Sequence, residues 1–163
     1  MSIKDQFTTD EWAQVLQAPM LAGLAVTAAD PGGLWSSIKE GSSVARSMVE
    51  TKATAEAGSL LAAIGADFDS AEGRRLVQDG VKDALRGKKP AEATQAAVER
   101  LRIVAALVET KAPDHAAAYK NWLRHTAKKV AEAGTEGGFM GFGGEKVSDA
   151  ERRTLADIDQ ALG

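Results

Sequence analysis

The fold class is decided by an unbroken apolar stretch, Ile103-Val104-Ala105-Ala106-Leu107-Val108. It lies in a run from 91 to 111 that contains neither Gly nor Pro. Because the stretch is apolar all round, it predicts a helix that is buried on every side. No segment of the chain shows the alternation with period two that is typical of a half-buried strand. The sequence therefore predicts an all-α bundle built around a central helix at 91–111.

The composition narrows the class of protein. A chain of 163 residues with 44% hydrophobic and 26% charged residues is typical of one globular domain, here 1–163. The net charge of −3 gives no electrostatic basis for general nucleic-acid binding. The lack of cysteine excludes thiolate catalysis and Cys-ligated metal sites. Since the N-terminus lacks a signal-peptide core and no apolar run is long enough to span a bilayer, we expect a cytoplasmic protein without a membrane partner.

Three helix starts share one pattern: an apolar residue, a capping residue, and a Glu three positions after the cap. They are Phe7-Thr8-Thr9-Asp10-Glu11, Phe68-Asp69-Ser70-Ala71-Glu72 and Val147-Ser148-Asp149-Ala150-Glu151. In this pattern the cap oxygen accepts from the third helical amide, while the Glu accepts from the amide of the cap. Phe7 and Trp12 are also spaced for a hydrophobic staple.

Prolines mark the starts of further helices, because the N–H that proline lacks has no hydrogen-bond partner in the first helical turn. Together these signals predict about six helices, at 9–29, 33–65, 70–86, 91–111, 114–133 and 148–162. We expect the first helix to kink near Pro19 and the second to break at Gly41, Ser42 and Ser43.

A glycine-rich loop at 134–146 precedes the last predicted helix. It contains Gly137-Gly138-Phe139-Met140-Gly141-Phe142-Gly143-Gly144, whose large apolar side chains are not those of a solvated linker. A phosphate-binding loop is the alternative, but no strand precedes it and Gly144-Glu145-Lys146 does not match the P-loop ending. We predict a hinge that fixes the last helix. Phe139, Met140, Phe142 and Trp35 are the candidates for an exposed apolar contact surface.

Acidic residues gather at the predicted helix start near 70. Asp67, Asp69 and Glu72 could offer oxygen ligands to a hard cation. The stretch fails as a calcium-binding loop, because its sixth position is Glu72 where that loop requires glycine. A capping box with one extra surface acid is the alternative interpretation.

The basic and imidazole side chains on the predicted helix at 114–133 suggest two further kinds of site. His115 and His125 lie on one helix without a Glu three residues before either, which excludes a di-iron carboxylate centre. Each could be a lone haem ligand or a surface residue. Lys120, Arg124 and Lys128 form a basic stripe that could contact nucleic acid or anionic lipid or be a solvated helix face.

The tail of the chain resembles a known group of proteins. The segment from Tyr119-Lys120 through Gly138-Phe139-Met140-Gly141-Phe142-Gly143-Gly144 to Val147-Ser148 and Glu151 is similar to a tail found in small bacterial all-helical proteins of unknown function. That resemblance implies the fold and no activity. The acidic stretch resembles the tellurite-resistance TerB-like helical domain, and this resemblance implies that Asp67, Asp69 and Glu72 are metal ligands.

No set of residues in the sequence has the spacing of a catalytic centre, so we predict neither catalytic residues nor a cofactor. The leading hypothesis is a non-enzymatic helical protein that acts through protein–protein contact or self-association, with a homodimer expected and nucleic acid excluded as a partner. The alternative is a helical bundle that binds a small molecule or a metal, in a stress response. An enzyme whose residues are brought together only by folding is the third hypothesis.

Overall fold

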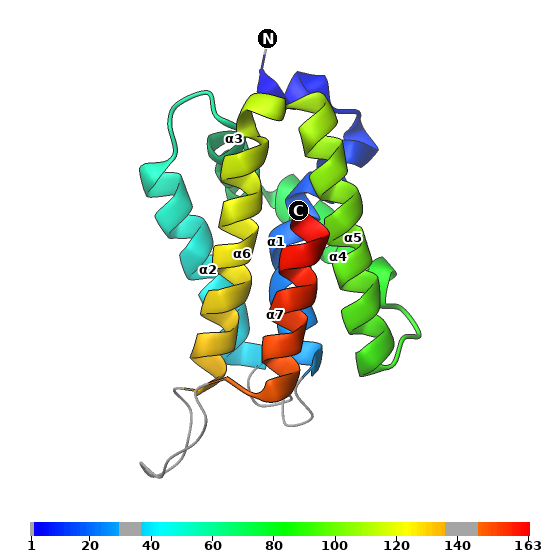
Figure 1. Cartoon of the computed structure of the whole chain (residues 1–163). Helices are drawn as coiled ribbons and strands as arrows, with labels where there is room; N and C mark the ends of the chain where they lie inside the picture. Colours follow the sequence, from blue (N-terminus) through cyan, green and yellow to red (C-terminus); the bar gives the residue numbers. More distant parts are fainter. Residues whose placement is uncertain (1, 30–36, 136–146) are drawn as a thin grey trace.

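The computed structural model describes residues 2–29, 37–135 and 147–163 (Figure 1). Within these ranges the chain is helical and contains no strand, which confirms the all-α prediction. The elements are a short 3-10 helix η1 (Ile3–Gln6) followed by α1 (Thr9–Ala29), α2 (Ser37–Thr54), α3 (Leu60–Asp69), α4 (Ala71–Leu85), α5 (Pro90–Lys111), α6 (Pro113–Thr135) and α7 (Asp149–Leu162).

The central helix is α1, and the prediction that 91–111 is central is wrong. Helix α1 packs against α2, α4, α5, α6 and α7, and eleven of its 21 residues are buried. Helix α5 buries one face only: Ile103, inside the apolar stretch, is 48% exposed. An apolar stretch shows that a helix can be buried on all sides, but single apolar residues are tolerated at a surface. Which helix becomes central depends on how many others pack on it.

A proline inside α1 is compensated from another helix. Pro19 has no N–H, so the carbonyl of Val15 loses the partner that it would have in a regular helix. The hydroxyl of Tyr119 in α6 donates to this carbonyl at 2.8 Å, and both residues are fully buried. The bend expected near Pro19 stays a prediction. The carbonyl that Pro19 leaves without a helical donor accepts a hydrogen bond from Tyr119 instead.

The second predicted helix, 33–65, is divided, but later than expected. Helix α2 runs through Gly41 and ends at Thr54. The break follows at Gly58, whose φ of +83° lies in the left-handed region that favours glycine. The hydroxyl of Ser59 then accepts from the amide of Ala62 and begins α3.

Two of the three predicted capping boxes are confirmed. At α1, Thr8 and Glu11 exchange side-chain and backbone hydrogen bonds, and the rings of Phe7 and Trp12 pack at 5.7 Å as the staple predicts. At α7, Ser148 and Glu151 form the same reciprocal pair.

The third predicted capping box, between Asp69 and Glu72, does not form, and the cap lies one residue later. The cap of α4 is Ser70, which accepts from the amide of Gly73 at 2.9 Å, whereas Asp69 is still part of α3. Since α3 continues to Asp69, the first residue free to leave the helix and cap the next one is Ser70.

Helices α6 and α7 are antiparallel neighbours at the front of the bundle, and both pack on α1 and α5 (Figure 1). Helix α6 is also tied to α2 by a buried hydrogen bond between the hydroxyls of Ser47 and Thr126 at 2.8 Å and by an ion pair between Glu50 and Lys129. It extends to Thr135, so residues 134 and 135, predicted to belong to the glycine-rich loop, are helical, and the rest of that predicted loop lies outside the described residues.

Candidate functional site

A groove with a volume of about 440 Å³ lies at the surface between α6 and α7. Its floor is apolar and consists of Ala127, Ala131, Val147, Leu155 and Ile158. Its rim is charged and consists of Arg124, Lys128, Glu132, Arg152 and Asp159.

The floor follows from the helical repeat on each side. Ala127 and Ala131 are one turn apart on α6, and Leu155 and Ile158 are three residues apart on α7, so each pair shares a face. The two alanines are buried and short, which leaves space above them. Leu155 is only half-buried, so an apolar side chain of the floor stays accessible to a binding partner.

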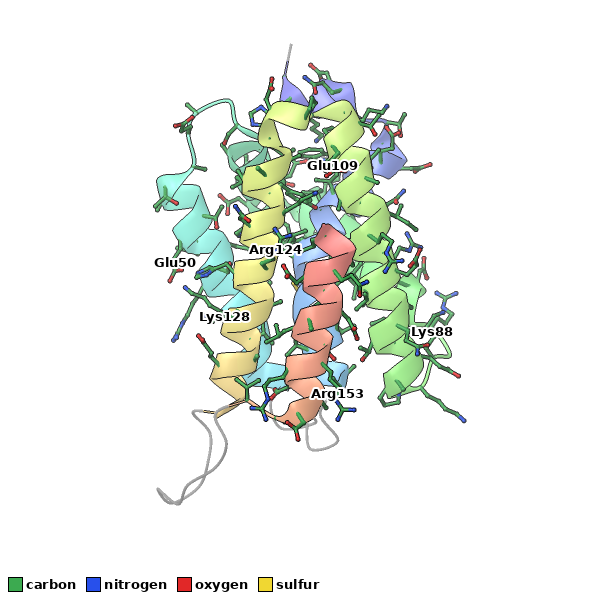
Figure 2. All side chains as sticks on the ribbon, viewed as in Figure 1. Glu50, Lys88, Glu109, Arg124, Lys128 and Arg153 are labelled. Atoms are coloured by element: carbon green, nitrogen blue, oxygen red, sulfur yellow. The ribbon has the colours of Figure 1, made fainter. Side chains whose placement is uncertain are left out.

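One end of the groove is closed by Arg124. Its guanidinium donates to the carboxylate of Asp159 and, at 3.1 Å, to the carbonyl of Gly163. A further hydrogen bond of 3.1 Å goes to the amide oxygen of Asn121 on the same helix. Figure 2 shows Arg124 on α6 beside α7. Arg124 therefore holds the C-terminal end of α7 against α6 rather than presenting a free charge.

The other end is built at the start of α7. Arg152 donates to the carboxylate of Asp149 and, at 2.6 Å, to the carbonyl of Val147. The hydrogen bond and the charge of this guanidinium lower the pKa of Asp149 below its usual range. Together with the capping pair Ser148 and Glu151, these contacts fix the first turn of α7.

The cation in the middle of the rim, Lys128, makes weaker contacts than the two arginines at the ends. The side chain of Lys128 is 69% exposed, and its ammonium lies 3.9 Å from the carboxylate of Glu132, one turn along the same helix. That distance is beyond a hydrogen bond. An exposed pair of this kind leaves the ammonium available to another carboxylate.

Two of the three cations in the basic stripe predicted on α6 are paired with neighbouring helices. Lys120 contacts Glu109 of α5 and Arg124 contacts Asp159 of α7, whereas Lys128 only lies near Glu132 of α6 itself. Lys120 and Arg124 therefore tie α6 to its neighbours. This arrangement favours the interpretation as a structural and solvated face over a surface for nucleic acid or anionic lipid.

The predicted acidic site is used differently from a metal centre. The carboxylate of Asp67 accepts from Lys4 at 2.7 Å and from the ring N–H of Trp12 at 2.6 Å, which ties α3 to η1 and α1. Glu72 is exposed on α4. Across residues 2–29, 37–135 and 147–163, no three His, Asp or Glu side chains gather in a group that could hold a metal ion. The structure gives the metal site at Asp67, Asp69 and Glu72 no support, and that site stays a prediction.

The predicted apolar contact residues Phe139, Met140, Phe142 and Trp35 lie outside the described residues. The histidines are both on α6, where His125 is exposed and His115 is half-buried. Neither histidine lines the groove.

Sequence reasoning missed the groove itself. Its one local signal is the apolar pair Leu155 and Ile158 in a last helix that is otherwise rich in charge. That pair shows that α7 has an apolar face, but only the packing of α7 against α6 shows that Leu155 is left partly uncovered.

Among the described residues, α1 alone is long and apolar enough to cross a membrane, and 61% of that stretch is buried inside the bundle. Core helices of globular proteins can be equally long and apolar. The cytoplasmic location stays a prediction.

Comparison of the chain with protein-family models, with curated proteins and with solved structures found no match.

Proposed function

We propose that this protein acts by binding another protein chain, and that the apolar side chains of this partner enter the groove between α6 and α7. The observation that carries the proposal is the groove itself: an apolar floor, open to solvent, between α6 and a helix α7 whose first turn and C-terminal end are both held by hydrogen bonds.

The chemistry of the groove fits a contact surface. Protein interfaces have an apolar centre that excludes water and a polar rim that stays hydrated. Here the half-buried Leu155 lies in the centre, and charged side chains surround it. Covering such apolar area stabilises a complex by about 25 cal/mol for each Å² removed from water, before the costs of association are subtracted.

The lining favours binding over nucleophilic catalysis. None of the ten described residues that line the groove is a Ser, Thr, His or Tyr. Its carboxylates and guanidinium groups are engaged in contacts that hold the helices, such as Arg124 with Asp159.

A small apolar molecule is the second candidate for the occupant. The volume of about 440 Å³ falls within the range of about 300 to 1,000 Å³ that is common for small-molecule sites. Such a ligand would raise the stability of the protein with the logarithm of its concentration relative to its Kd, by about 2.7 kcal/mol at 100 times the Kd.

The absence of cysteine from the chain permits a specific test, because one introduced cysteine is a unique attachment point. A photoreactive maleimide is attached to Leu155→Cys, in the groove, and to the control Ile103→Cys, an exposed apolar position on α5 outside it. Both proteins are irradiated in an extract of the source cells. Cross-linked products are identified by mass, with unlabelled wild-type protein or unlabelled Leu155→Lys added as competitor.

We expect one reproducible protein product, or a second copy of this chain, from Leu155→Cys and not from Ile103→Cys. Unlabelled wild-type protein should suppress it, and Leu155→Lys should not, because a charge on the floor opposes entry of an apolar side chain. Equal products from the two positions, or no product that wild-type protein suppresses, would show that the groove is not a protein-binding site. An adduct of a small molecule at Leu155→Cys alone would favour the second candidate.

A further inference from the structure

We infer that the element which enters the groove is an amphipathic α-helix of the partner, with a carboxylate beside its apolar anchors that pairs with Lys128. This inference rests on the proposed function and names the chemistry of the partner at the same site.

The shape of the groove indicates a helix. Its lining on α6 extends from Arg124 to Glu132 and on α7 from Arg152 to Asp159. At 1.5 Å per residue these distances are about 12 Å and about 10 Å, or two turns of helix. Two antiparallel helices with short alanine side chains between them allow a third helix to pack closely along their axes. Two turns give room for apolar anchors at spacings of three and four residues.

The charge along the rim indicates an acidic flank. The two ends of the groove are occupied by Arg124 with Asp159 and by Arg152 with Asp149. Between these two ends, the side chain of Lys128 is 69% exposed, and its ammonium lies 3.9 Å from the carboxylate of Glu132. A carboxylate on the incoming helix would therefore meet the one rim cation that has no hydrogen-bonded ion-pair partner within the described chain.

The net charge of −3 does not oppose this pairing. At physiological ionic strength charges beyond about 8 Å are screened, so the charges of the rim dominate over those of distant surfaces. With Asp149, which pairs with Arg152, the rim holds three cations and three carboxylates, so it has no net charge that would repel an incoming carboxylate.

The test uses designed peptides as probes. Two fluorescent peptides of fourteen residues carry leucine at positions spaced by three and four residues, and differ only in having Glu or Lys beside the leucines. A third peptide has the Glu sequence with a central proline, which prevents a helix. Their affinities are measured by anisotropy at physiological ionic strength for the full-length protein and for its variants Lys128→Glu and Lys128→Gln. The matched control is Lys82→Glu, an exposed lysine of α4 outside the groove.

We expect the Glu peptide to bind wild-type protein about three- to five-fold more tightly than the Lys peptide, as one exposed ion pair allows. Lys128→Gln should abolish this preference, Lys128→Glu should reverse it, and Lys82→Glu should leave it unchanged. The proline peptide should not bind.

The inference is overturned if no peptide binds, if the proline peptide binds equally well, or if Lys128→Glu keeps the preference of wild-type protein. If the peptide test fails but Leu155→Cys gives a specific protein cross-link, the groove binds a protein partner that is not an acidic amphipathic helix. Absence of that cross-link would remove the proposed function itself.

Discussion

At the residue scale, the contact between Tyr119 and Val15 shows how a proline in one helix is compensated from another. Pro19 deprives the carbonyl of Val15 of its helical donor, and the hydroxyl of Tyr119 replaces it from α6. The hydrogen bond also explains why a tyrosine, rather than a phenylalanine, occupies this fully buried position.

We predict that Tyr119→Phe lowers the free energy of unfolding by about 1 to 3 kcal/mol, because it leaves a buried carbonyl without a donor. The cost should shrink when Pro19→Ala is also present, since an alanine at this position would supply the missing N–H. Urea unfolding of the two single variants and the double variant measures this coupling. An equal cost of Tyr119→Phe in both backgrounds would contradict the compensation.

The same tyrosine predicts a loss of stability at high pH. Burial raises the pKa of Tyr119 well above 10.0, so the folded protein keeps the phenolic proton. The unfolded chain loses that proton near pH 10, at the usual tyrosine pKa. Because the unfolded state then binds fewer protons than the folded state, stability is unaffected below pH 10 and falls as the pH rises above it.

Tyr119 is the one tyrosine in the chain, so tyrosinate absorbance near 295 nm reports on it alone. We expect this absorbance to rise together with the loss of helical circular dichroism. Tyrosinate formation near pH 10 in a fully helical protein would contradict the buried environment.

Residue-level contacts were predictable only where the partners are close in sequence. The capping pairs Thr8 with Glu11 and Ser148 with Glu151 are three residues apart, and their pattern identifies them. The hydrogen bond from Trp12 to Asp67 joins residues 55 positions apart. No local pattern reveals such a bond, so the sequence alone indicates Asp67 only as a candidate metal ligand, which stays a prediction.

At the scale of elements, α7 forms one wall of the groove and depends on its first turn. The hydroxyl of Ser148 accepts from the amide of Glu151, whose carboxylate accepts from the amide of Ser148. We predict that Ser148→Ala destabilises α7 by about 1 kcal/mol, as the loss of an N-cap does. Amide hydrogen exchange should become faster in the first turns of α7.

The control for this prediction is Ser148→Asp, which keeps an oxygen that can accept from the same amide and should preserve the protection. Equally slow exchange in Ser148→Ala and wild-type protein would show that packing alone orders the start of α7.

The positions of the helices in the sequence were largely predictable, but which helix lies at the centre of the core was not. Proline, glycine and capping residues mark where helices begin and end, so most bounds lie close to those expected. The break between α2 and α3 was placed too early, because Gly41 is tolerated inside a helix while Gly58 adopts a positive φ. The central position of α1 depends on contacts with all six other α-helices of the described chain, which no single segment encodes.

At the scale of the whole molecule, the groove exists because α6 and α7 pack on α1 and α5 with small residues facing the space between them. The sequence predicted the two helices, and it predicted the basic stripe that supplies Arg124 and Lys128. It did not predict that these residues border an apolar floor, since the distance between two helices far apart in sequence is set by the entire bundle.

We propose that this groove binds another protein chain. Native mass spectrometry of protein gently isolated from its source cells tests it most directly, with wild-type protein compared with Leu155→Lys and with the control Ile103→Lys. Our account predicts that wild-type protein and Ile103→Lys carry a second protein chain, and that Leu155→Lys is isolated without it. The same masses for all three proteins, apart from the substitutions themselves, would contradict the claim.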